Sequence, residues 1–137
     1  MKRCVCLIAL LTACGSDGIV SSDIHVRDAD TIVLNGRKGT PVRFEGVDAP
    51  ELETQEGREG KQWMIDYLQG KSVRCDLTGE MNGDRHIGTC YVDGGNLSAA
   101  VIAAGHALDC ARYSGGRYRH LETPASKSRL RRAKYCG

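Results

Sequence analysis

A chain of 137 residues is long enough for one compact core and too short for two, which excludes a multidomain architecture. The formal net charge of +2 identifies no partner, because Lys2 and Arg3 account for all of it. Residues 112–137 hold eight basic residues and one acidic residue, a net charge of +7, beside a segment 14–111 of net charge −7. This division suits a protein that attracts a polyanion and holds a divalent cation, although taken alone a solvated basic helix is the simpler explanation.

The first residues resemble an export signal. Two basic residues precede an apolar run over residues 4–11, which is far too short to cross a bilayer as a helix. The run ends in Leu11-Thr12-Ala13-Cys14, which resembles the lipobox of bacterial lipoproteins. We therefore expect residues 1–13 to be a signal peptide, Cys14 to carry lipid, and the protein to lie outside the cytoplasm, anchored to the cell envelope. An ordinary cleaved signal, which would give a secreted or periplasmic protein, is the alternative.

Four cysteines remain beyond the expected leader and lipid anchor, namely Cys75, Cys90, Cys110 and Cys136. No CxxC spacing occurs among them, which argues against a zinc site. Disulfides in an oxidising compartment are the better explanation, and four cysteines allow three connectivities.

The segment after the leader, residues 14–22, is small and polar and is expected to be a tether, with the folded domain over residues 23–137. Apolar residues then recur at period two over 24–26, 32–34 and 42–44, which predicts three strands in a meander. Asn35-Gly36 supplies turn chemistry between the second and third.

The hydrophobic period changes between residues 57 and 70, where Met64, Tyr67 and Leu68 fall on one helical face. Two strands are predicted over 72–77 and 85–92, followed by a helix with Asn96 as its N-cap. Thr123-Pro124 predicts the start of a third helix. These elements predict an α+β domain, in the order expected of a five-stranded barrel with three helices.

Three groups of charged residues stand at strand ends. The first is Asp28-Ala29-Asp30-Thr31, which by itself could be a simple turn. The second is Arg43-Phe44-Glu45-Gly46-Val47-Asp48-Ala49-Pro50-Glu51, where an arginine, an aspartate and a glutamate surround a turn stiffened by proline. Oxygen ligands of this kind suit a hard cation such as calcium. The third is Asp84-Arg85, at the start of the fifth predicted strand.

Together, in this order, the three groups resemble the thermonuclease (staphylococcal nuclease-like) family over residues 24–134, and the V-D-A-P-E stretch is the specific part. The resemblance implies the oligonucleotide/oligosaccharide-binding (OB) fold, a five-stranded β-barrel with three α-helices. It also implies a calcium-dependent phosphodiesterase that hydrolyses DNA and RNA with low sequence specificity. A catalytically weak or inactive OB-fold module that binds nucleic acid is the alternative. We expect a monomer.

The resemblance also implies roles for individual residues. Asp30 and Asp48 would ligate calcium through their carboxylates and Ala49 through its carbonyl, with Asp28 behind them. Glu51 would position or deprotonate the attacking water. Arg43 and Arg85 would hold the scissile phosphate, since a guanidinium fork suits phosphate oxygens. Tyr113 would lie against the bound nucleotide, and Tyr118 could join it in contacting a single strand.

The chain departs from the family pattern in three places. Ala29 stands where many relatives have glycine, and a positive φ there would strain it. Asp84 adds a carboxylate beside Arg85, which could weaken the hold on phosphate or contribute to metal binding. Tyr135-Cys136 replaces the usual late tryptophan.

The resemblance to secreted members of the family implies two disulfide pairings. Cys75 and Cys90, in neighbouring predicted strands, would face each other. Cys110 would tie the segment after the second helix to Cys136.

Overall fold

The structure is a computed structural model, and it describes residues 18–137. The expected signal peptide, the Cys14 lipidation site and the first part of the expected tether lie outside the described residues. Within residues 18–137, no helix is long and apolar enough to cross a membrane.

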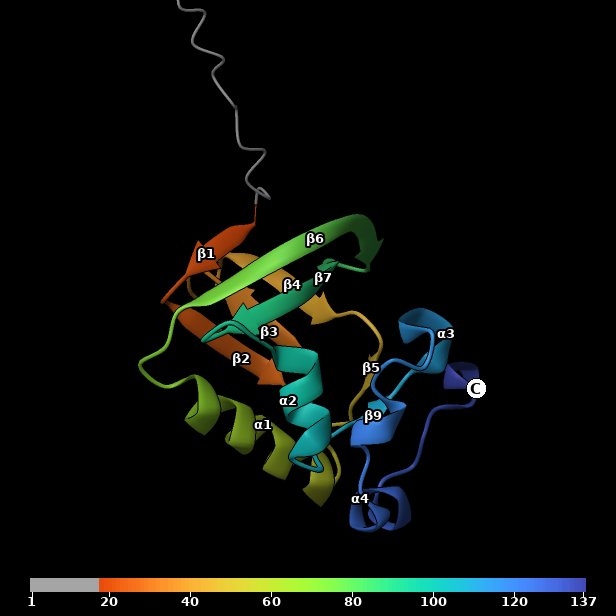
Figure 1. The fold of residues 1–137 in the computed structure, drawn as a ribbon. Coiled ribbons are helices and arrows are strands. Elements are labelled where there is room, and N and C mark those ends of the chain that lie inside the picture. The colour runs from red at the N-terminus through yellow and green to blue at the C-terminus, as the bar shows by residue number, and fades with distance from the viewer. Residues whose placement is uncertain (1–17) are drawn as a thin grey trace, which may run out of the picture.

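A seven-stranded sheet forms the body of the molecule (Figure 1). Its strands follow the order β1-β6-β7-β4-β3-β2, with β8 paired to β7, and every ladder is antiparallel except β4 with β7. Their bounds are β1 Ile19–Ser21, β2 Ile24–Asp28, β3 Thr31–Leu34, β4 Thr40–Phe44, β6 Val73–Asn82, β7 Arg85–Val92 and β8 Gly95–Asn96. The meander predicted from period two is therefore confirmed as β2, β3 and β4, which pair in sequence order.

Two expectations about the sheet need correction. The expected five-stranded barrel is not found: the described chain forms a seven-stranded sheet, and β1 and β2 are the two ends of its open path of ladders. The expected tether also reaches too far, since Ile19–Ser21 pairs with Val73–Cys75 of β6 as strand β1. Its small polar neighbours hid this edge strand, which is only three residues long.

The first helix, α1, spans Gln55–Leu68 and packs along β2. Thr54 caps it by accepting a hydrogen bond from the Gly57 N–H. The predicted cap of α2 (Leu97–Ala103) is also confirmed, because the Asn96 side chain accepts from the Ala99 N–H. Met64 and Leu68 of α1, with Val101 and Ile102 of α2, complete the core beside the sheet.

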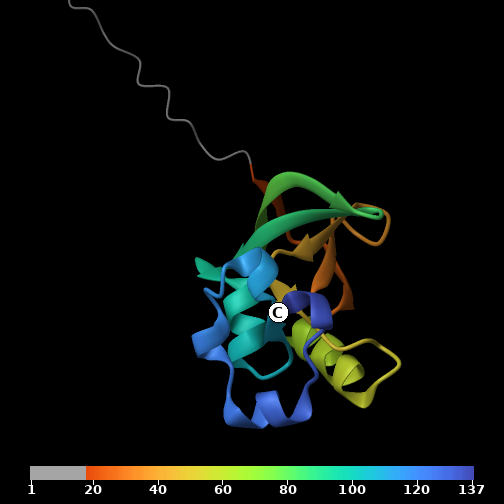
Figure 2. The same ribbon diagram turned by 90° about the vertical axis from the view of Figure 1, so that its right-hand side faces the viewer.

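Several short elements, most of them after α2, were not predicted from the sequence. They are β5 Val47–Asp48 paired with β9 Leu108–Asp109, α3 Ala111–Ser114, and the 3₁₀ turns Arg119–Leu121 and Lys134–Cys136. The predicted third helix is α4, Pro124–Arg129, with Thr123 as its N-cap and proline in its first turn. Figure 2 shows the C-terminal segment returning from α4, and its final turn contacts α3.

Both expected disulfides are present. Cys75 and Cys90 face each other across β6 and β7, and Cys110 joins Cys136. All four cysteines are buried. The second bridge fixes the end of the chain beside β9.

Candidate active site

The turn between β2 and β3 fixes the direction of one buried carboxylate. Asp28 Oδ1 accepts the backbone N–H of Asp30 at 3.0 Å, which closes the turn. Asp30 is 7% exposed, and its Oδ1 accepts the hydroxyl of Thr31 at 2.8 Å. Asp28 therefore supports the backbone at Asp30 through this hydrogen bond.

Ala29 occupies this turn without backbone strain. Among the described residues, positive φ values outside glycine occur only at Asn35 and Asp93. Ala29 is fully buried, and a Cβ added to Gly60 of α1 would lie 3.0 Å from the Ala29 Cβ. Ala29 has no positive φ, so the strain that such an angle would cause is absent, and the helix has no side chain at Gly60, where the Ala29 Cβ lies close.

Arg43 leaves β4 and reaches the same carboxylate. Its Nη2 lies 3.6 Å from Asp30 Oδ2, its Nη1 donates to the Val47 carbonyl at 3.3 Å, and its side chain is 16% exposed. Burial lowers the pKa of this guanidinium, but the charge of Asp30 and the hydroxyl of Tyr135 outweigh it and raise the pKa overall. Arg43 is therefore a fixed, permanently charged group.

Arg85 approaches from the other side, at the start of β7. Its Nη1 donates to Thr31 Oγ1 at 3.1 Å and its Nη2 to Asn82 Oδ1 at 2.6 Å. Since the Thr31 hydroxyl in turn donates to Asp30, one hydroxyl connects Arg85 to the carboxylate that Arg43 flanks.

Asp84 is directed away from this cluster. It forms a two-pronged ion pair with Arg27, at 2.7 and 3.2 Å, and both side chains are largely exposed. Hydrogen bonding to Arg27 is the main cause of the lowered pKa of Asp84. Arg27 is thus the hydrogen-bonding partner of Asp84, while the charge of Arg85 also contributes to lowering the pKa of Asp84.

Asp48 lies at the end of β5, whose pairing with β9 brings it opposite Leu108. Its Oδ2 accepts the backbone N–H of Ala133 at 2.6 Å. Burial raises the pKa of Asp48, the Ala133 N–H opposes that shift, and the charge of Asp30 adds to it. Asp30 and Asp48 are thus close enough to repel each other.

A third carboxylate shares this repulsion. Burial, followed by the negative charge of Asp30, raises the pKa of Asp28 to about 7. Carboxylates held together against their mutual repulsion suit a hard cation, which takes oxygen ligands and retains water. Within residues 18–137 no group of three or more His, Cys, Asp or Glu side chains is placed so that it could hold a metal ion. Asp30 and Asp48 are the two carboxylates of this cluster that could contribute oxygen ligands to a cation.

The turn that follows β5 carries Ala49 and Glu51. Both line a hollow of about 460 Å³ together with Asp48 and Ala133. The Glu51 carbonyl accepts the N–H and hydroxyl of Thr54 ahead of α1, whereas its side chain is exposed. Glu51 is thus beside Asp48 and accessible from solvent.

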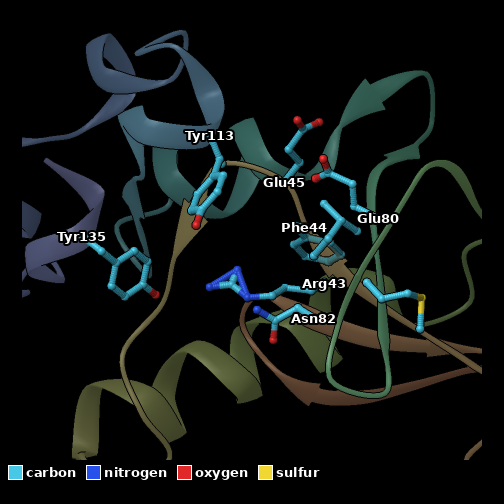
Figure 3. Close-up of a pocket in the computed structure, with 10 residues that line it drawn as sticks. Arg43, Phe44, Glu45, Glu80, Asn82, Tyr113 and Tyr135 are labelled. Carbon is cyan, nitrogen blue, oxygen red and sulfur yellow. The ribbon is translucent and has the colours of Figure 1, made fainter.

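A larger cavity of about 700 Å³ opens above Arg43 (Figure 3). Tyr113 and Tyr135 line it, and Figure 3 shows the Arg43 guanidinium extending toward their rings. Tyr113 is 53% exposed. Tyr135 was missed as a site residue, since the sequence presents it only as a replacement for a tryptophan.

Tyr118 requires a correction. It is 4% exposed, belongs to the core, and its hydroxyl accepts from the Asn96 side chain at 2.8 Å. Its ring is also covered by the Arg117 guanidinium, 4.7 Å from the ring centre. Tyr118 therefore anchors α2 and does not offer a face to a nucleotide.

The amino-acid sequence is similar to those of known nucleases. A family model described as "Staphylococcal nuclease homologue" matches residues 41–133, which include Arg43, Asp48, Glu51 and Arg85. Two proteins named as uncharacterized endonucleases, from Escherichia coli O157:H7 and Escherichia coli, are each 31% identical over 103 residues, covering 70% of this chain and 67% of theirs. A probable staphylococcal-like nuclease of Oryza sativa subsp. japonica is 31% identical over 72 residues, which is 53% of this chain and 22% of the rice protein.

Proposed function

The chain belongs to the staphylococcal nuclease family, and we propose that it is a calcium-dependent phosphodiesterase that cuts DNA and RNA with low sequence specificity. One observation carries the proposal. The Asp30 carboxylate lies between two guanidiniums, in an ion pair with Arg43 and joined to Arg85 through the Thr31 hydroxyl. Two permanent positive charges beside buried carboxylates fit a reaction at a phosphate group held next to a cation.

The chemistry explains this choice of residues. A phosphodiester repels an incoming nucleophile, and its transition state gathers negative charge on the equatorial oxygens. Arg43 and Arg85 would offset that charge with planar forks that match phosphate oxygens, and their protein partners hold them in place before substrate arrives. Calcium held by Asp30, Asp48 and the Ala49 carbonyl would supply further positive charge at the same phosphate.

Two further residues have proposed roles. Glu51 is an exposed carboxylate beside Asp48, which suits it to orient the attacking water and accept its proton. Tyr113 faces the Arg43 cavity and would stack on a base of the bound strand.

We also propose that the protein acts outside the cytoplasm as a monomer, with a lipid anchor on Cys14. The basic and apolar leader and its lipobox-like end support export. The two disulfides suit an oxidising compartment. Mass analysis of the mature N-terminus tests the anchor, because a lipidated cysteine has a characteristic mass and an unmodified N-terminus contradicts it.

A plasmid-nicking assay tests the enzymatic proposal. Supercoiled DNA, and separately single-stranded RNA, should be cut in calcium chloride and left intact when a chelator is added first. Cleavage that resists the chelator contradicts the calcium requirement. Binding of nucleic acid without cleavage contradicts the enzyme and indicates the non-catalytic module instead.

A further inference from the structure

Residues close to the C-terminus contact the proposed site, although they lie far from Asp48 in the sequence. We call residues 131–136 the C-terminal segment. The Ala133 N–H in this segment donates to Asp48 Oδ2 at 2.6 Å, across 85 positions of sequence. Tyr135, two residues later, lines the cavity above Arg43 (Figure 3). The segment thus contacts Asp48, a proposed calcium ligand, and lines the same cavity as Arg43, which is proposed to bind phosphate.

Side chains with strong partners hold the segment in place. Arg132 binds both carboxylate oxygens of Glu122 at 2.8 Å and also donates to the Asp109 carbonyl. The Glu122 side chain is fully buried and accepts the Asp109 N–H as well. The residue before Ala133 is therefore fixed to β9.

The disulfide fixes the other end of the segment. Cys136 is bonded to Cys110, which directly follows β9. Strand β9 is in turn paired with β5, and β5 carries Asp48. The Ala133 N–H and the Asp48 carboxylate are consequently both attached to the β5–β9 ladder. Their relative position is fixed by Arg132 before Ala133 and by the disulfide after it.

We propose that the Ala133 peptide N–H is a positioning group for Asp48, and that the Cys110–Cys136 bridge serves the active site by holding it there. The inference rests on the proposed function, since Asp48 must bind calcium for its orientation to matter. A hydrogen-bond donor to one oxygen of a metal-binding carboxylate fixes the direction of the other oxygen. The free energy of metal binding then does not have to include the cost of ordering that side chain. Loss of such a supporting contact typically weakens metal affinity or activity by about 10- to 100-fold.

The backbone at Ala133 permits a sharp test. Its φ of −62° is a proline angle, so Ala133→Pro removes the N–H without demanding a new φ. Ala133→Gly keeps the N–H and is the matched control. Calcium affinity, measured by calorimetry with calcium chloride alone, should fall about 10- to 100-fold in Ala133→Pro and stay close to wild type in Ala133→Gly. The turnover number at saturating calcium should move far less than the calcium affinity.

Equal calcium affinity in the two Ala133 variants, with a wild type that binds calcium and cuts DNA, overturns this inference alone. A wild type that neither binds calcium nor cuts DNA overturns the proposed function and this inference together. The two failures are therefore distinguishable.

A second pair of variants decides the matter if Ala133→Pro does not fold. Cys110→Ser/Cys136→Ser and Cys75→Ser/Cys90→Ser both open a buried bridge, across sequence separations of 26 and 15. Chain entropy predicts similar losses of stability from loops of such similar length. Calcium affinity should fall only in the first variant. Equal loss in both, or none in the first, contradicts the proposed role of the C-terminal bridge.

Discussion

Replacing Arg85 by alanine isolates the proposed work of a guanidinium on phosphate. Arg85 donates to Thr31 and Asn82, both uncharged, so its removal breaks none of the ion pairs found within residues 18–137. Arg43 is a less clean choice, because its removal also takes the ion-pair partner from Asp30. Arg85→Ala should therefore reduce activity without unfolding the protein.

The magnitude follows from the contacts that are lost. Two hydrogen bonds in a partly exposed setting contribute about 1 kcal/mol each to stability, which leaves a folded domain. A donor aimed at charge that develops in the transition state contributes about 3–4 kcal/mol to the barrier, equivalent to a few hundredfold in rate. Arg85→Lys should recover only part of this loss, since a point charge cannot reproduce the fork.

The assay is the initial rate of cleavage of a fluorescent single-stranded DNA at saturating calcium, together with the denaturation midpoint. Arg37→Ala is the matched control, because Arg37 is an exposed arginine in the turn between β3 and β4 and is not among the proposed site residues. It should retain nearly the full rate. An Arg85→Ala protein that keeps more than about a tenth of the wild-type rate contradicts the reasoning.

Three further outcomes are expected. In calcium-free protein the pKa of Asp28 is about 7, against 3.8 for the free side chain, so its contribution to the free energy of unfolding is fully present below pH 3.8 and is lost as the pH rises toward 7. In urea titrations at several pH values, Asp28→Asn should show a smaller decline in the free energy of unfolding over this range. A stability difference between Asp28→Asn and wild type that does not vary with pH contradicts this expectation. In Gly60→Ala the gain of about 1 kcal/mol in helix propensity is opposed by the new Cβ, 3.0 Å from the Ala29 Cβ, so Gly60→Ala should be more favourable in an Ala29→Gly background than in wild type in a double-mutant cycle; additive effects disprove the contact. Tyr113→Ala should raise KM for single-stranded DNA by the equivalent of about 1–3 kcal/mol with unchanged stability, and an unchanged KM removes Tyr113 from the strand-binding surface.

Periodic segments of the fold were predictable because each buries one regular face. Period two located β2, β3 and β4, and helical spacing located α1. The two-residue strands β5 and β9 could not be predicted, because two residues carry no period and their pairing spans sixty positions of the chain. The five-stranded barrel was wrong for a related reason, since the sequence pattern gives the order of the strands but not the ladders between them.

Some residues of the candidate site could likewise be predicted from the sequence, and others could not. Side chains with charge at strand ends, such as Asp30, Arg43 and Arg85, could be predicted because their chemistry is visible in the sequence. The Ala133 N–H could not, since every residue except proline has such a donor and only the tertiary structure selects this one. Tyr118 was misassigned because an aromatic ring beside arginines gives the same sequence pattern whether it is buried or exposed. Asp84 was likewise readable as a charge, but its partner Arg27 lies 57 positions away.

A crystal structure determined in calcium chloride tests most directly whether these residues surround one cation. The account predicts a single calcium ion bound by the Asp30 and Asp48 carboxylates and the Ala49 carbonyl at about 2.3–2.6 Å, with Arg43 and Arg85 facing the same open side. Calcium bound elsewhere on the chain, or a site without calcium at saturating concentration, contradicts it.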